Sequence, residues 1–92
     1  MVETTNSIFN TTLYNAISTS TALSWQRAMV ANTLARSGKE WTDLFAMYNS
    51  GTYNNQWMVL DVNLTRSYLA SSLSAPSAAA GLFWIVEQVP SI

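Results

Sequence analysis

The chain has 92 residues, four lysine or arginine residues against five acidic ones, and neither histidine nor cysteine. Without these two residue types it can hold no disulfide, no cysteine nucleophile, no Ser–His couple and no typical zinc site. Its net charge of −1 provides no basic surface, which argues against nucleic acid as a partner.

The composition suggests a piece of something larger. Apolar residues make up 49% of the chain and charged residues only 10%, whereas a free-standing small domain carries about 25–35% charged residues on its surface. A chain of this length also buries only roughly 60–65% of its unfolded surface. We therefore expect residues 1–92 to be a single partial domain that packs against the remainder of a parent chain.

The first third of the chain predicts little regular structure. Met1–Thr5 is typical of the end of a strand, and Ile8–Thr21 is rich in Asn, Thr and Ser, which predicts a loop with a short turn near Leu13–Ile17. No signal peptide is recognisable here, so a secretory signal would lie upstream of Met1.

Two helices are expected next. Apolar and long side chains recur at helical spacing at Leu23, Arg27, Val30 and Leu34, which predicts a helix from Ala22 to Arg36. Ser20 or Thr21 would cap its start and Gly38 would follow its end. A second helix is predicted by the stripe of apolar residues at Trp41, Leu44, Phe45 and Tyr48.

Two strands follow, each with a continuous apolar character that predicts cover on both faces. They are expected at Gln56–Val62 and Leu82–Val89, joined by a long Ser- and Ala-rich loop over Asn63–Gly81. The apolar runs are too short to cross a bilayer, so no transmembrane segment is expected. The fold class is therefore α+β, with two helices followed by two buried strands.

The turn before the first of these strands, Asn49–Trp57, contains several amide or indole N–H donors and no charge. Neutral donors at a helix-to-strand turn suit a developing oxyanion, and Asn49 is the best placed. The alternative is that these side chains only cap the helix and bond their own backbone, as Asn-rich turns usually do. Tyr53 and Trp57 could equally be core aromatics.

The run YNSGTYNNQWMVLD, from Tyr48 to Asp61, resembles the signature stretch of the phospholipase B-like family. Similar stretches occur in the same order at ETTNSIFN, LSWQRAMVANTLARSGKEW and WIVEQVP, whereas Asn63–Gly81 matches least. The resemblance implies part of an αββα sandwich of the N-terminal-nucleophile hydrolase type. In that type, a Cys freed at a new N-terminus attacks the acyl carbon; here it would lie upstream of Met1.

The resemblance also implies roles for individual residues. Asn49 would be the oxyanion donor, with Thr52, Tyr53, Asn54 and Trp57 as supporting residues. The substrate would be a lipid ester, such as a phospholipid, or an N-acyl amide, and no metal or organic cofactor is implied. An alternative is a non-catalytic relative or interaction module whose turn binds a polar ligand or braces the fold. A membrane-surface module fits less well, because the helices lack a basic face.

The family resemblance places the parent protein in the lysosomal lumen or outside the cell. Two glycosylation sequons agree with this location, at Asn10 and Asn63, both in predicted loops. Two sequons are also what chance gives in a chain this rich in Asn, Ser and Thr, so their number alone decides nothing.

Overall fold

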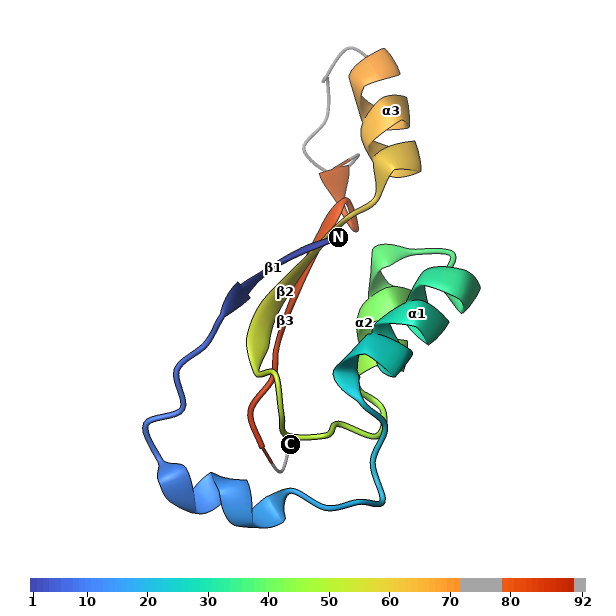
Figure 1. The fold of residues 1–92 in the computed structure, drawn as a ribbon. Coiled ribbons are helices and arrows are strands. Elements are labelled where there is room, and N and C mark those ends of the chain that lie inside the picture. The colour runs from blue at the N-terminus through green and yellow to red at the C-terminus, as the bar shows by residue number, and fades with distance from the viewer. Residues whose placement is uncertain (72–78, 91–92) are drawn as a thin grey trace.

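A computed structural model describes residues 1–71 and 79–90, and it confirms the α+β class. The elements in chain order are a strand, a short 3₁₀ helix, two α-helices, a strand, a third α-helix and a last strand: β1 (Val2–Thr5), η1 (Thr11–Ala16), α1 (Ser24–Leu34), α2 (Gly38–Ala46), β2 (Asn55–Leu60), α3 (Val62–Ala70) and β3 (Phe83–Glu87). Figure 1 shows α3 beyond one end of the sheet and η1 at the other.

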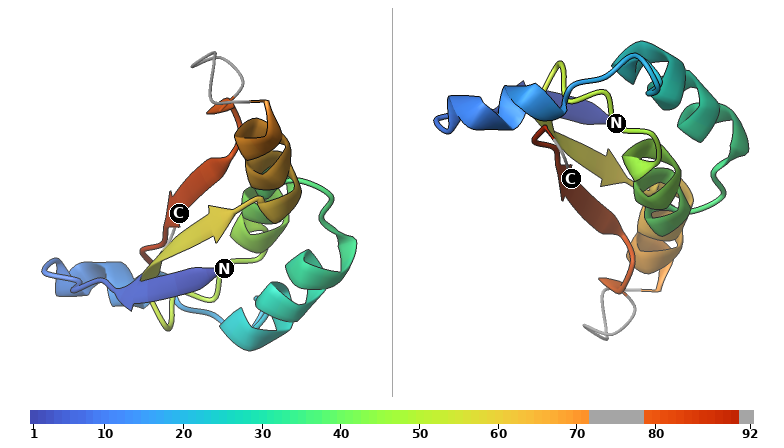
Figure 2. Two further views of the ribbon diagram at one scale, coloured as in Figure 1. Left: turned by 90° about the horizontal axis from the view of Figure 1, so that it is seen from above. Right: turned by 90° about the horizontal axis from the view of Figure 1, so that it is seen from below.

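The three strands form an antiparallel sheet in the order β1-β2-β3. Met58 lies opposite Val2 on one side and Ile85 on the other, whereas Trp57 lies opposite Glu3 and Val86. Because neighbouring residues of a strand point to opposite faces, this register gives the sheet two distinct faces. Both α1 and α2 lie on the same side of the sheet, as the two views of Figure 2 show.

The core lies between α2 and the sheet. Trp41 and Phe45 of α2 stack with their ring centres 4.8 Å apart, and Phe45 lies 4.6 Å from the ring of Trp57 on β2. Val59 of β2 and Ala31 of α1 complete the buried cluster. Each buried aromatic of this kind removes about 150–250 Å² from water, so α2 provides most of the cover that this chain gives its sheet.

The predicted second helix is confirmed, but its ends differ from the expectation. Ser37 is the N-cap, and its Oγ accepts a hydrogen bond from the backbone N–H of Glu40. Gly38 is the first residue of α2 rather than the end of α1, and it packs so closely on Trp84 that an added Cβ would lie 2.5 Å from Trp84 Cδ1. Tyr48 lies beyond the end of α2 and is exposed.

The first helix is shorter than predicted, and its cap was placed wrongly. Its N-cap is Leu23, not Ser20 or Thr21, and the backbone N–H of Leu23 donates to Gln26 Oε1. The buried residues of α1 are Arg27 and Ala31. The apolar members of the predicted row, Leu23, Val30 and Leu34, are exposed instead, as are Trp25 and Met29 of the same helix.

The loop predicted over Asn63–Gly81 is wrong in its first half, where α3 forms. Asp61 is the N-cap of this helix, and its Oδ1 accepts from the backbone N–H of Leu64 at 3.0 Å. Such a cap satisfies a free N–H group of the first turn and stabilises the start of the helix by about 1 kcal/mol. Residues 72–78 of the predicted loop lie outside the described part of the chain.

Both predicted strands exist, but residues 1–71 and 79–90 provide a helical layer on only one face of the sheet. Trp84 and Val86 of β3 pack against the core, whereas Phe83 and Ile85 point the other way and are 52% and 50% exposed. Within residues 1–71 and 79–90, no helix has the length and apolar character needed to cross a membrane.

Candidate functional site

The turn between α2 and β2 has an unusual backbone. Tyr48 and Tyr53 both have a φ of 55°, and Gly51 between them has a φ of 72°. Glycine adopts this left-handed conformation easily, but each tyrosine is held there at a cost of about 1–3 kcal/mol. Such strained residues persist only where surrounding contacts hold them, and they concentrate at functional sites.

Asn49 is fixed at both ends of its side-chain amide. Its Nδ2–H donates to the backbone carbonyl of Val89 at 2.8 Å, and its Oδ1 accepts from the backbone N–H of Gly51 at 3.0 Å. The first bond ties the turn to the end of β3, forty residues further along the chain. The amide plane of Asn49 is therefore oriented by the fold as well as by its own turn.

Thr52 and Asn54 shape the turn from within. The backbone N–H of Thr52 donates to Ser50 Oγ, and the two hydroxyl oxygens of Ser50 and Thr52 lie 3.0 Å apart. Asn54 is buried and its Nδ2–H donates to the carbonyl of Gly51 at 2.9 Å, while its Oδ1 has no partner among the described residues. Both residues thus bond mainly to the turn itself, as the capping alternative predicts.

Tyr53 and Trp57 lie on the helix-facing side of the sheet with ring centres 6.4 Å apart. Trp57 belongs to the core, although its Nε1–H has no partner among the described residues. Tyr53 is 63% exposed. Together they line an open hollow of about 450 Å³ whose other wall is the exposed side of α1, with Trp25 and Met29.

A second hollow, of about 340 Å³, lies on the other side of Tyr53. It is lined by Thr52, Tyr53 and Asn54 from the turn and by Ile8 and Tyr14 from the N-terminal stretch. All four residues predicted to support Asn49 therefore lie along these two hollows. Their proximity in space follows from their proximity in the sequence, so it does not by itself indicate a site.

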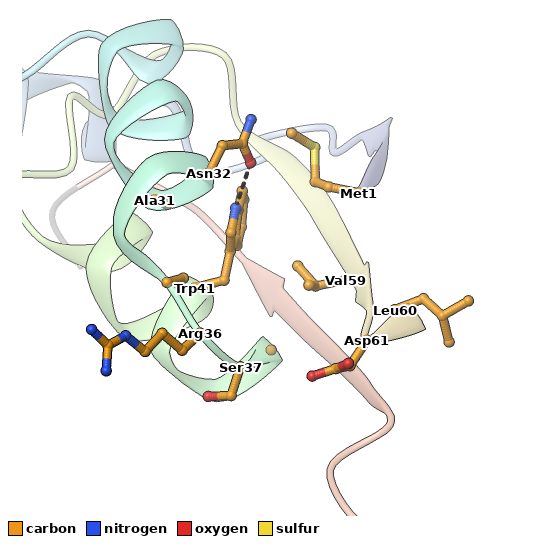
Figure 3. A pocket seen from close by; sticks show the side chains of 11 residues that line it. Met1, Ala31, Asn32, Arg36, Ser37, Trp41, Val59, Leu60 and Asp61 are labelled. Carbon is orange, nitrogen blue, oxygen red and sulfur yellow. Dashed lines mark hydrogen bonds between the residues drawn. The ribbon is translucent and has the colours of Figure 1, made fainter. Parts of the chain in front are cut away.

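Another hollow lies away from this turn, at the corner between α1 and α2 (Figure 3). Trp41 Nε1–H donates to Asn32 Oδ1 at 2.8 Å in its wall, and Arg36 and Asp61 stand at its rim. It contains none of the predicted site residues. Among the residues that the structure describes, no three His, Cys, Asp or Glu side chains gather as a metal site would require.

Arg27 is a functional candidate that sequence reasoning missed, because it was counted as one position of an apolar helix stripe. It is 4% exposed, and the centre of its guanidinium lies 4.5 Å from the ring centre of Phe45. Burial lowers the pKa of Arg27, but an arginine remains protonated in proteins. A charged residue in the middle of an apolar stripe was the available signal.

The two sequon residues are exposed, but only one is in a loop. Asn10 precedes η1, and its Oδ1 accepts from Thr12 Oγ1 at 2.6 Å. Asn63 lies in the first turn of α3, so its predicted loop placement is wrong. Among the described residues, the salt bridge joins Lys39 and Asp43.

The fold and the site together define a class of protein: an α+β segment with a neutral, donor-rich turn at the start of its central strand. The described residues cover one face of its sheet and leave the other open. The family follows from comparison with known proteins. The sequence model of the phospholipase B family matches residues 1–92, so the chain belongs to that family.

Individual relatives agree with this assignment. The chain is 50% identical over 91 residues to Phospholipase B-like 1 of Homo sapiens and 47% identical over 91 residues to that of Rattus norvegicus. It is 43% identical over 90 residues to Phospholipase B-like protein A of Dictyostelium discoideum. These alignments cover 98–99% of this chain but only 14–15% of each relative. The chain thus spans about one seventh of the length of the curated relatives it matches.

Proposed function

We propose that this chain is one segment of a phospholipase B-like acyl hydrolase and that Asn49 donates a hydrogen bond to the oxyanion of the reaction. The family assignment supports the reaction class, which is nucleophilic acyl transfer to water on a lipid ester or an N-acyl amide. The observation that carries the role of Asn49 is its amide, oriented by Val89 and Gly51.

The chemistry of the turn fits this role. When a nucleophile attacks an acyl carbon, the carbonyl oxygen becomes negatively charged, and a preorganised N–H donor stabilises it without having to reorient. No residue from Tyr48 to Leu60 carries a formal charge. The donor is therefore neutral, and its contribution does not depend on the protonation of the turn.

The rest of the site comes from the parent chain in this proposal. The chain contains no cysteine, so the Cys nucleophile of the N-terminal-nucleophile type, with its free α-amino group as the base, lies outside residues 1–92. We place the parent protein in the lysosomal lumen or outside the cell, where Asn10 and Asn63 are candidate glycan acceptors.

The test is Asn49→Ala in the full-length parent protein, with fatty-acid release from phosphatidylcholine in mixed micelles as the readout. Loss of an oxyanion donor lowers kcat by about 10²–10³, and we expect a decrease of that size. Asn15→Ala is the matched control, because Asn15 is exposed on η1. An Asn49→Ala enzyme that keeps wild-type kcat would refute the oxyanion role.

The second candidate is a bracing or ligand-binding turn in a non-catalytic relative. One observation favours it: the amide of Asn49 already bonds two backbone groups of its own chain. Bracing predicts that Asn49→Ala lowers the melting temperature while any activity of the parent stays unchanged. The oxyanion role predicts instead that Asn49→Ala loses activity at temperatures where the variant is still folded.

A further inference from the structure

Arg27 lies at a junction of three elements. Its Nε–H donates to the carbonyl of Ala22 at 3.1 Å, just before α1. Its Nη1–H donates to the carbonyl of Phe45 in the last turn of α2, and its Nη2–H lies 3.4 Å from Gln88 Oε1 beyond the end of β3. The guanidinium therefore fastens the start of α1, the end of α2 and the end of β3 to one another.

These three anchor points surround the Asn49 turn. The backbone N–H of Ala22 donates to the carbonyl of Tyr48, the residue before Asn49. Gln88 is followed directly by Val89, whose carbonyl accepts from Asn49 Nδ2–H. Arg27 thus bonds Ala22, which holds the turn at Tyr48, and Gln88, which precedes the residue that holds Asn49.

Burying a charged guanidinium is an energetically costly way to hold these three elements together. Within the described part of the chain, no carboxylate lies within 4 Å of the buried guanidinium, whose partners are two carbonyls and an amide. Gln88, the amide partner, also has its Nε2 buried without a hydrogen-bond partner among the described residues. Apolar residues of similar volume are often as stable as a buried charge or more so, so packing alone does not call for an arginine.

We infer that Arg27 is a positioning residue for the Asn49 turn: its three-way hydrogen bonding fixes the end of α2 relative to the end of β3, and thereby sets where the amide of Asn49 points. This inference rests on the proposed role of Asn49 in the reaction. A planar guanidinium is suited to the task because its fork of N–H groups reaches several acceptors at fixed angles. Lysine, with one flexible ammonium, cannot reproduce that fork.

The test uses Arg27→Met and Arg27→Lys in the full-length parent, with Arg66→Met as the control for loss of an exposed arginine on α3. Methionine keeps the packing against Phe45 and removes every N–H donor. We expect Arg27→Met to lower kcat by roughly 10–10² on phosphatidylcholine micelles with KM within about twofold, since a donor misplaced by about 1 Å loses that much. Arg27→Lys should lie between Arg27→Met and wild type.

A structural readout separates positioning from catalysis. The backbone N–H of Gly51 donates to Asn49 Oδ1, so hydrogen exchange at Gly51 reports whether Asn49 is held in place. We expect this exchange to accelerate by about tenfold in Arg27→Met and to stay at the wild-type rate in Arg66→Met. Unchanged exchange at Gly51 in Arg27→Met would overturn the inference, whatever happens to activity.

A double variant completes the design. If Arg27 acts through Asn49, then adding Arg27→Met to Asn49→Ala costs no further kcat, because residues that act as a unit are not additive. Multiplied losses would overturn the inference and assign Arg27 a separate role. Wild-type activity in Asn49→Ala, with faster Gly51 exchange in Arg27→Met, would refute the proposed function while supporting the mechanical link.

Discussion

The two faces of the sheet differ in what this chain gives them. On one face, Trp57 and Val59 of β2 lie under the aromatic side chains of α2 and are at most 8% exposed. On the other face, Leu60, Phe83 and Ile85 are each about half exposed, at 50–52%. The two faces are similarly apolar, yet only one has a helical layer from residues 1–71 and 79–90.

The contrast shows which contacts are local to the segment and which depend on the parent protein. The contacts on the covered face hold α2 in place, and the end of α2 determines where the Asn49 turn begins. An apolar open face of this kind is usually an interface, and the chain accounts for only 14–15% of its relatives' length. We therefore expect other parts of the parent chain to cover Phe83 and Ile85.

The largest expected effect comes from comparing one aromatic on each side of the sheet. Phe45 is fully buried by this chain, so Phe45→Ala should lower the free energy of unfolding of the parent by about 3–5 kcal/mol. We expect Phe83→Ala to cost at least ~2 kcal/mol in the full-length protein, because the missing cover is present there. Denaturant titration of both variants measures these losses in the free energy of unfolding. A loss near zero for Phe83→Ala would mean that the open face is exposed to solvent in the parent too.

A smaller effect tests how tightly α2 lies on the covered face. An alanine at position 38 would place its Cβ 2.5 Å from Trp84 Cδ1, so Gly38→Ala should lose about 1–3 kcal/mol through overpacking. Trp84→Ala removes the atom that clashes. In that background Gly38→Ala should be neutral in thermal unfolding, and an equal loss in both backgrounds would show that the close approach is not the cause.

The smallest effect is expected where α2 faces water. Lys39 Nζ lies 2.6 Å from Asp43 Oδ2, but both side chains are 62% exposed. Exposed pairs at this helical spacing contribute only about 0.3–0.5 kcal/mol. Asp43→Asn should therefore shift the melting temperature hardly at all, and by still less in 1 M salt. A shift as large as that of Gly38→Ala would contradict the division into a core side and a water side.

Sequence reasoning recovered what depends on local periodicity. The positions of Trp41 and Phe45 one helical turn apart predicted α2 and its buried side, and the apolar run around Trp57 predicted β2. The turn between them was identified from its residues as the candidate site. These features could be read because each is encoded within about ten consecutive residues.

Features that depend on distant partners could not be read in this way. Arg27 is 61 residues from Gln88, and Asn49 is 40 residues from Val89. Nothing in the spacing of α1 shows that its buried residues are Arg27 and Ala31 rather than the larger apolar ones, because that choice is made by where α2 lies. The helix α3 was missed for a local reason: its start depends on one cap, Asp61, and no residue of α3 is buried.

The pairing of β1 with β2 has a consequence for the order of folding. Both main helices lie between these two strands in the chain, and all four residues of β1 are exposed. Closing so long a loop brings an entropic cost before any contact repays it, so non-local strand pairs form late. The hairpin-like contact of β2 with β3 and the stacking of α2 do not need β1. During synthesis β1 is made before β2 and β3, yet it is expected to be the last of these three strands to join the sheet.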